Sequence, residues 1–256
     1  MSHRGVTVGA LSDRGRVRSS NEDRFAVLAA PELVAGLSSV LVVADGVGGH
    51  QGGAVASSLV VDHLKRRFTR QGLLHRQADP ATVLVRTIVA ANSSVVSRAA
   101  RDPHLAGMAS TVTAVVISGD ELFLAHVGDS RAYLVRQGGI RQLSRDHSWV
   151  AEAVHAGRLD PAQATSHPYR HVVTRAVGGA VTIDVDAATF ALSTGDVVVL
   201  CTDGLSNLVD DAELLRSALE HQVPNDAARS LVELANARGG SDNITVLVAR
   251  IGAHAD

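Results

Sequence analysis

Short, uninterrupted apolar runs dominate the chain, and four of them adjoin an aspartate. The runs are residues 39–44, 122–127, 197–202 and 244–249, and the adjoining aspartates are Asp45, Asp129, Asp203 and Asp242. A buried strand typically has such a run, so a carboxylate at its tip lies at the edge of a sheet. Where neighbouring strands are antiparallel, one that ends in Asp and one that starts after Asp meet at the same edge. The carboxylates can then converge, and such a cluster needs cations to be stable.

The rest of the pattern separates into further strands and two pairs of helices. Strands are predicted at residues 7–11, 24–29, 111–117, 131–135 and 182–190, and helices at 54–70, 81–100, 211–219 and 225–237. Residues 46–53 form a glycine-rich loop between a strand and a helix. Strands in runs followed by helices in pairs favour an α+β fold with antiparallel sheets over an alternating βαβ fold.

Residues 145–175 break this pattern, being polar, rich in histidine and only locally helical. We interpret the segment as a flap over the core, and we expect residues 1–256 to form a single domain. Substrate selection is expected at the flap, because binding residues concentrate on loops held by a rigid scaffold.

Composition narrows the function classes. An apolar content of 46% suffices for a large core, and a formal net charge of -2 argues against affinity for nucleic acid or an anionic membrane. The single cysteine, Cys201, lies in an apolar run and suits a reducing compartment. No stretch has the length and apolarity of a membrane span or a signal peptide, so we expect a soluble, cytoplasmic protein.

Each polar motif is ambiguous when it is taken alone. Asp45-Gly46 suits a metal site but equally an ordinary turn, although Asp203-Gly204 repeats the arrangement after another buried strand. The tripeptide Asn21-Glu22-Asp23 reads as a solvated polar turn. Residues 128–131 read as a hairpin corner with an incidental pair between Asp129 and Arg131.

In this order and with these spacings, however, the motifs resemble those of the PPM-type metal-dependent Ser/Thr protein phosphatases, the protein phosphatase 2C family, in its bacterial branch. The matching segments are residues 12–23, 44–50, 110–114, 127–132, 175–178, 201–206 and 239–246, which span nearly the whole chain.

The resemblance implies a central sandwich of two antiparallel β-sheets flanked by helices, a four-layer αββα fold with metals in a cleft at one end. Asp45 would bridge two Mn²⁺ or Mg²⁺ ions, with Asp203 and Asp242 on the first ion and the Gly46 carbonyl and Glu22 on the second. Asp129 matches a position that, with Asp203, holds a weaker third ion. Asp23 and Asn243 would lie around the ligands and substrate, with Asp23 orienting waters.

The implied reaction is hydrolysis of phosphoserine and phosphothreonine in proteins by a metal-activated bridging water, without a covalent phosphoenzyme. Arg18 matches the phosphate-binding arginine, and its spacing favours it over Arg14 and Arg16. The expected partners are phosphorylated proteins, with Ser/Thr kinases among them, and we expect a monomer.

The chain departs from the family pattern near the glycine loop. Val47 stands where eukaryotic relatives carry a histidine proposed to protonate the leaving group. His50, further along the loop, could contact substrate, metal-bound water or only solvent. Among the other histidines, His126 is interpreted as structural, and the spacing of the flap histidines, His147, His155, His167 and His171, favours a polar lid surface over a transition-metal site.

Two alternative functions stay open from the residues alone. A pseudophosphatase would use the same fold as a regulatory binding module, although the retained carboxylates Asp45, Asp203 and Asp242 speak against it. Another metal-dependent phosphoesterase, such as a nuclease, is disfavoured by the near-neutral charge and the lack of a basic stripe.

Overall fold

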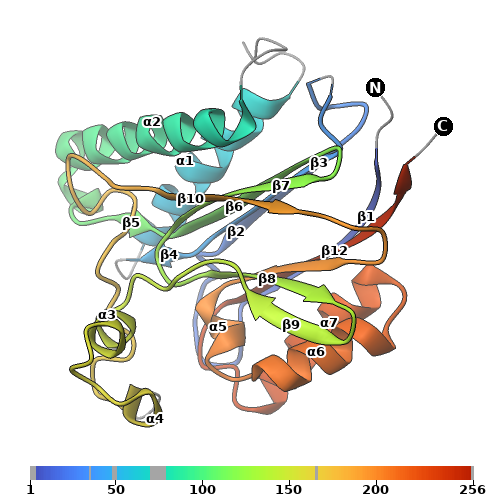
Figure 1. Cartoon of the computed structure of the whole chain (residues 1–256). Coiled ribbons are helices and arrows are strands. Elements are labelled where there is room, and N and C mark those ends of the chain that lie inside the picture. Colours follow the sequence, from blue (N-terminus) through green and yellow to red (C-terminus); the bar gives the residue numbers. More distant parts are fainter. Residues whose placement is uncertain (1–3, 35, 48–50, 70–78, 165–166, 255–256) are drawn as a thin grey trace.

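Two five-stranded antiparallel sheets form the centre of the molecule in a computed structural model that describes residues 4–34, 36–47, 51–69, 79–164 and 167–254 (Figure 1). The first sheet has the order β1 (Arg4–Asp13), β12 (Ile244–His254), β11 (Val197–Cys201), β8 (Arg131–Arg136) and β9 (Gly139–Gln142). The second has the order β10 (Asp186–Ala191), β7 (Glu121–Val127), β6 (Val112–Ser118), β3 (Ser39–Ala44) and β2 (Arg24–Ala29).

Helices cover the outer face of each sheet, which gives four layers (Figure 1). The second sheet is covered by α1 (Gln51–Phe68) and α2 (Pro80–Arg101). The first is covered by α5 (Asp203–Ser206), α6 (Asp211–Glu220) and α7 (Pro224–Ala237). The predicted α+β fold, a four-layer αββα sandwich, is confirmed. Two short helices, α3 (Trp149–His155) and α4 (Pro161–Ala164), lie in the flap segment and project from one end of the sandwich.

Burial on both faces explains why the strands appear in the sequence as continuous apolar runs. In β3, Val40 and Val42 pack under α1 and α2, whereas Leu41 and Val43 pack between the two sheets. All four side chains are fully buried. Alternate residues of one strand therefore belong to two different cores, and neither face tolerates a polar side chain.

Helix α1 begins earlier than predicted, at Gln51, so it takes up two glycines of the expected loop. Gly53 lies in the first turn of α1. Only glycine fits at this position, because a Cβ there would lie 2.1 Å from Glu22 Oε2. The preceding residues form β4 (Gly46–Val47), which pairs with β5 (Ala109–Ser110). His50, which belongs to the same predicted loop, lies outside the described residues.

Strand β10 begins at Asp186, so the prediction that it starts at residue 182 is wrong. Its pairing with β7 ends at Asp186 opposite His126, and β7 stops one residue later, before Gly128 with its φ of +113°. Residues 182–185 therefore have no strand to pair with. Strand β9 and the single turn α5 were not predicted, because both are shorter than the periodicity that reveals an element.

No described helix has the length and apolarity needed to cross a membrane.

Candidate functional site

The aspartates at the strand tips meet at one end of the sandwich, around a cavity of about 530 Å³ that we call the carboxylate cavity. Strands β3 and β7 of the second sheet lead to Asp45 and Asp129, and β11 and β12 of the first sheet adjoin Asp203 and Asp242. Antiparallel pairing of β11 with β12, with Cys201 opposite Val246, places Asp203 and Asp242 at the same edge. Glu22 also lines the cavity.

Asp45 lies among other carboxylates at the tip of β3. Burial raises the pKa of its carboxyl well above the ordinary value, and the charges of Asp23, Asp203 and Asp129 raise it further. The Asp45 backbone N–H donates to Thr111 Oγ1 at 2.9 Å, and the Thr111 N–H donates back to the Asp45 carbonyl at 2.9 Å. These two hydrogen bonds to the buried Thr111 fix the position of the Asp45 backbone, from which the side chain projects.

Asp129 and Asp23 are two further buried carboxyl groups near the cavity, and desolvation raises the pKa of each. Burial raises the pKa of Asp129 to about 8, with the charges of Asp203 and Asp146 as further causes. Burial also raises the pKa of Asp23 to about 7, although Thr245 and Thr202 donate hydrogen bonds to its Oδ2 at 2.7 and 2.9 Å and oppose the shift. Asp23 Oδ1 is buried without a hydrogen-bond partner.

Asp203 sits in the first turn of α5 rather than in a simple turn. Its Oδ2 accepts a hydrogen bond from Asn207 Nδ2 at 3.1 Å, whereas its Oδ1 is buried without a donor. Burial and the charge of Asp242 raise its pKa. Negative charge thus accumulates on the cavity wall without enough donors to balance it.

Arg18 is the arginine that reaches this cavity from the loop between β1 and β2. Its Nη2 donates to Asp242 Oδ2 at 2.7 Å. Arg14 instead donates to the Ser19 carbonyl, and the Arg16 backbone N–H donates to the Gly240 carbonyl. Of the three arginines, Arg18 is the one whose side chain lines the carboxylate cavity.

Asn243 ties two loops of the site together. Its Oδ1 accepts from the Glu22 N–H at 2.8 Å, and its Nδ2 donates to the carbonyls of Arg14 and Ser20 at 2.9 Å each. The side chain is almost fully buried. Asn243 therefore holds the loop that carries Glu22 and Arg18 against the loop that carries Asp242.

Close backbone packing explains the glycine at position 46. A Cβ on Gly46 would lie 2.4 Å from the carbonyl carbon of Gly53 in α1. Ser57 of the same helix donates to the Glu22 carbonyl at 2.6 Å. Helix α1 thus holds Gly46 and Glu22 next to each other on the cavity wall.

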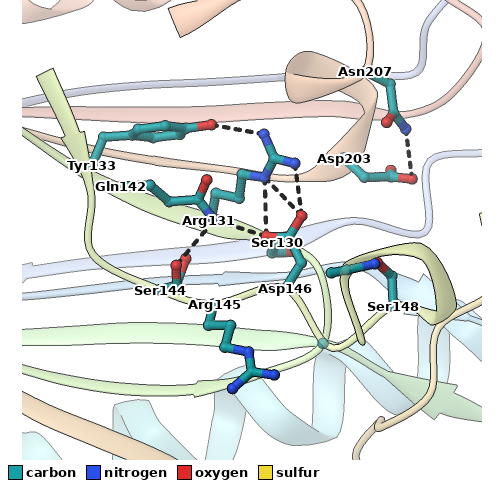
Figure 2. Close-up of polar contacts among 12 residues, drawn as sticks. Ser130, Arg131, Tyr133, Gln142, Ser144, Arg145, Asp146, Ser148, Asp203 and Asn207 are labelled. Atoms are coloured by element: carbon teal, nitrogen blue, oxygen red, sulfur yellow. Dashed lines mark hydrogen bonds and ion pairs between the residues drawn. The ribbon is translucent and has the colours of Figure 1, made fainter. Parts of the chain in front are cut away.

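Figure 2 shows a polar cluster around Arg131 and Asp146. Arg131 Nε and Nη2 donate to the Asp146 carboxylate, Nη2 at 2.7 Å, and Nη1 donates to the Tyr133 hydroxyl at 3.1 Å. Gln142 Nε2 donates to Asp146 Oδ1 at 2.8 Å. The expected incidental pair between Asp129 and Arg131 is therefore not the one that forms. Arg131 anchors Asp146, the second residue of the flap segment, and no local sequence signal identifies this partner.

The flap histidines have separate roles. His147 is buried, accepts from the Gly128 N–H through Nδ1 at 3.1 Å and contacts Asp186 Oδ2 through Nε2 at 3.1 Å. His167 stacks on Trp149 with 4.6 Å between ring centroids, and His171 lines the carboxylate cavity. In the part of the chain that the structure describes, no three His, Cys, Asp or Glu side chains converge closely enough to form a complete ion site.

His126, by contrast, is fully buried in β7. Its Nε2 lies 3.0 Å from the carbonyls of Gly128 and Arg145, and because carbonyls only accept, Nε2 carries the proton. Thr113 Oγ1 lies 2.9 Å from Nδ1. Burial lowers the pKa of His126 to about 4. His126 thus has a structural environment and links β7 to the start of the flap.

The arrangement of these motifs has a counterpart among known proteins. The sequence pattern described as protein phosphatase 2C matches residues 15–236, most of the chain. The chain belongs to the protein phosphatase 2C family. The serine/threonine phosphatase Stp of Listeria innocua is 35% identical to this phosphatase over 237 residues, which cover 93% of this chain and 92% of that protein.

Two solved structures resemble this phosphatase closely. The serine/threonine phosphatase PstP/Ppp of Mycobacterium tuberculosis superposes with a TM-score of 0.85 at 37% identity, covering 96% of this chain and 99% of that one. A structure of the PstP catalytic domain in complex with two manganese ions superposes with a TM-score of 0.83 at 36% identity, covering 96% and 98%. Membership of the family disfavours both the nuclease and the pseudophosphatase alternatives, since the strand-tip carboxylates are all in place.

Proposed function

We propose that this phosphatase hydrolyses phosphoserine and phosphothreonine in proteins at the carboxylate cavity, using two Mn²⁺ or Mg²⁺ ions. The observation that carries the proposal is that Asp45, Asp203 and Asp242, which come from both sheets, line one cavity that Arg18 also lines. The manganese complex of the related PstP catalytic domain supports the choice of ion.

The residues present fit divalent cations. The pKa values of Asp23, Asp45, Asp129 and Asp203 are all raised, so the cavity lacks positive charge to hold these groups ionised. The buried Oδ1 atom of Asp203 has no donor. Carboxylate and carbonyl oxygens are the ligands that Mg²⁺ and Mn²⁺ prefer.

We assign the ligand roles as follows. Asp45 would serve both ions, Asp203 and Asp242 the first, the Gly46 carbonyl and Glu22 the second, and Asp129 with Asp203 a weaker third. When bound, the ions would neutralise the carboxylates and supply a water of lowered pKa as the nucleophile. Asp23, held by Thr202 and Thr245, would orient water at the edge of the site.

The chain's own contribution to the reaction is positioning and charge. The Arg18 guanidinium, half-exposed at the cavity, can hold two phosphoryl oxygens with its planar fork as charge redistributes in the transition state. Asn243 keeps the loops of Arg18 and Asp242 together. His50 is the candidate for a contact with the leaving group or with solvent, and it lies outside the described residues.

The test is hydrolysis of a phosphothreonine peptide with and without Mn²⁺, for the wild type and Asp203→Asn. Phosphate release that requires the metal and falls at least a hundredfold or so in the variant supports the proposal. Bound metal without turnover in the wild type contradicts it and favours a regulatory binding module.

We further propose a setting for this activity. The one cysteine is buried and unpaired, which suits the reducing cytoplasm of a bacterial cell. We also propose that the protein is a monomer. We propose phosphorylated signalling proteins, Ser/Thr kinases among them, as substrates, and residues 1–256 as one catalytic domain whose flap contributes to their selection.

A further inference from the structure

A second cavity, of about 410 Å³, adjoins the carboxylate cavity. Val47 and Val173 line both cavities, so they form the divide between them. Small and apolar side chains make up much of the remaining wall, among them Ala109, Ala176, Ala180 and Ile183. We call this second space the side cavity. Its volume is in the range of roughly 300–1,000 Å³ that is usual for ligand sites.

The side cavity is built on the same backbone ribbon as the metal site. Strand β4 pairs Val47 with Ala109 of β5, and Ser110 of β5 pairs in turn with Val177. Two backbone hydrogen bonds of 2.9 and 2.8 Å join Ser110 and Val177. Gly46, the other residue of β4, lines the carboxylate cavity. The ribbon therefore fixes the distance and orientation between the two cavities.

Asn92 of α2 fixes the outer wall. Its Oδ1 accepts from the Gly178 N–H at 2.7 Å, and its Nδ2 donates to the carbonyls of Ala180 and Val181 at 3.0 and 3.1 Å. The Asn92 side chain is almost fully buried. The loop that leads from the flap to β10 is thus held in one shape, so a ligand would bind here without first having to order the wall.

The charges around the side cavity decide what it would accept. Arg175 lines the cavity, but its Nη1 donates to Asp186 Oδ1 at 2.7 Å, so its charge is already compensated. Asp184 adds a carboxylate to the wall. An acidic ligand group would therefore meet repulsion without a free cation to bind, whereas an apolar side chain would cover Val47, Val173 and Ile183.

We propose that the side cavity is a specificity subsite, which takes an apolar, non-acidic side chain of the substrate protein near its phosphorylated residue. The inference rests on the proposed function, because it requires the phosphoryl group to sit in the carboxylate cavity. A substrate chain that crosses the divide formed by Val47 and Val173 places a neighbouring side chain in the side cavity. Selection then occurs where the flap returns to the core.

The experiment uses phosphothreonine peptides that carry either Leu or Glu at each of the three positions on either side of the phosphorylated residue. At one position we expect kcat/KM of the wild type to favour Leu by about tenfold, the usual effect of an apolar side chain in a pocket. The variant Ala180→Trp, which fills the side cavity, should lose this preference. Val181→Trp is the matched control, since Val181 is 79% exposed and does not line the cavity.

p-Nitrophenyl phosphate separates this inference from the proposed function, because it carries no neighbouring side chain. Wild type that fails to hydrolyse it with Mn²⁺ contradicts the proposed function itself. Wild type that hydrolyses it but treats all peptides alike overturns the subsite only. Equal loss of preference in Ala180→Trp and Val181→Trp also overturns it. If Ala180→Trp no longer hydrolyses p-nitrophenyl phosphate, Thr182→Trp replaces it, because Thr182 is another exposed residue that lines the side cavity. Its preference for Leu over Glu is then compared with that of Val181→Trp.

Discussion

Arg18 Nη2 donates to Asp242 Oδ2 at 2.7 Å, across 224 positions of the sequence. The two side chains carry the opposite halves of the proposed chemistry, phosphate binding and metal binding. Because the two side chains bind each other, a phosphoryl group would compete with Asp242 for Arg18, and a cation would compete with Arg18 for Asp242. Arg18 therefore connects substrate affinity with metal affinity.

Replacement of Arg18 by Ala tests that connection. We expect kcat/KM for a phosphothreonine peptide to fall about tenfold to a hundredfold, because a charge-assisted hydrogen bond to the phosphoryl group is lost. Mg²⁺ should bind more tightly, because Asp242 no longer has a competing partner. Steady-state kinetics and calorimetric titration measure both, with Arg16→Ala as the control. Weaker Mg²⁺ binding in Arg18→Ala would contradict the connection.

The pH dependence of metal stabilisation follows from the raised pKa values of Asp23 and Asp129, about 7 and about 8. Without a cation, the stability associated with their neutral forms is present at low pH and lost as pH rises through 7 and 8. Because a cation favours the ionised forms, the rise in Tm caused by Mg²⁺ should grow between pH 6 and pH 8.5. Differential scanning calorimetry checks this. Asp203→Asn should largely remove the effect, and a rise that shrinks with pH would count against the assignment.

His126 gives the opposite pH dependence. Its pKa of about 4 lies below the ordinary value of 6.5, so its contribution is fully present above pH 6.5 and is lost as pH falls toward 4. Between pH 7 and pH 5 we expect the free energy of unfolding to fall by about 2 kcal/mol from this group. In His126→Gln this portion of the fall should vanish. Urea unfolding at both pH values measures the unfolding free energy of each protein. An equal fall of that free energy between pH 7 and pH 5 in the two proteins would refute the prediction.

Arg131 should matter to the flap through its fork rather than its charge. Arg131→Lys keeps the charge but cannot hold Asp146 and Tyr133 together, so we expect a loss of about 1–3 kcal/mol in unfolding free energy. Limited proteolysis within residues 157–164 should also become faster. Arg98→Lys, at an exposed 3.6 Å pair with Asp102, is the control and should change neither quantity measurably. An Arg131→Lys protein as stable as the control would exclude the anchor.

Much of the site follows from the sequence because burial and strand polarity are local properties. A run such as residues 39–44 can only be a doubly covered strand, and its polar end must lie at an edge. Antiparallel pairing of β11 with β12 then brings Asp203 and Asp242 together. The glycine at position 46 is equally local in its signal, although the reason for it, the approach of Gly53, comes from packing.

The pattern of the sequence predicts the α+β class, most of the strands and the carboxylates at the strand tips. The packing of distant segments sets which side chains meet. Arg131 pairs with Asp146 rather than Asp129, Arg18 pairs with Asp242, and Asn92 binds the loop beyond Gly178. Periodicity reports whether a residue is buried, and it contains no information about which distant side chain it meets. Those pairings, and the side cavity between β4, β5 and the flap, arise when separate segments pack against one another.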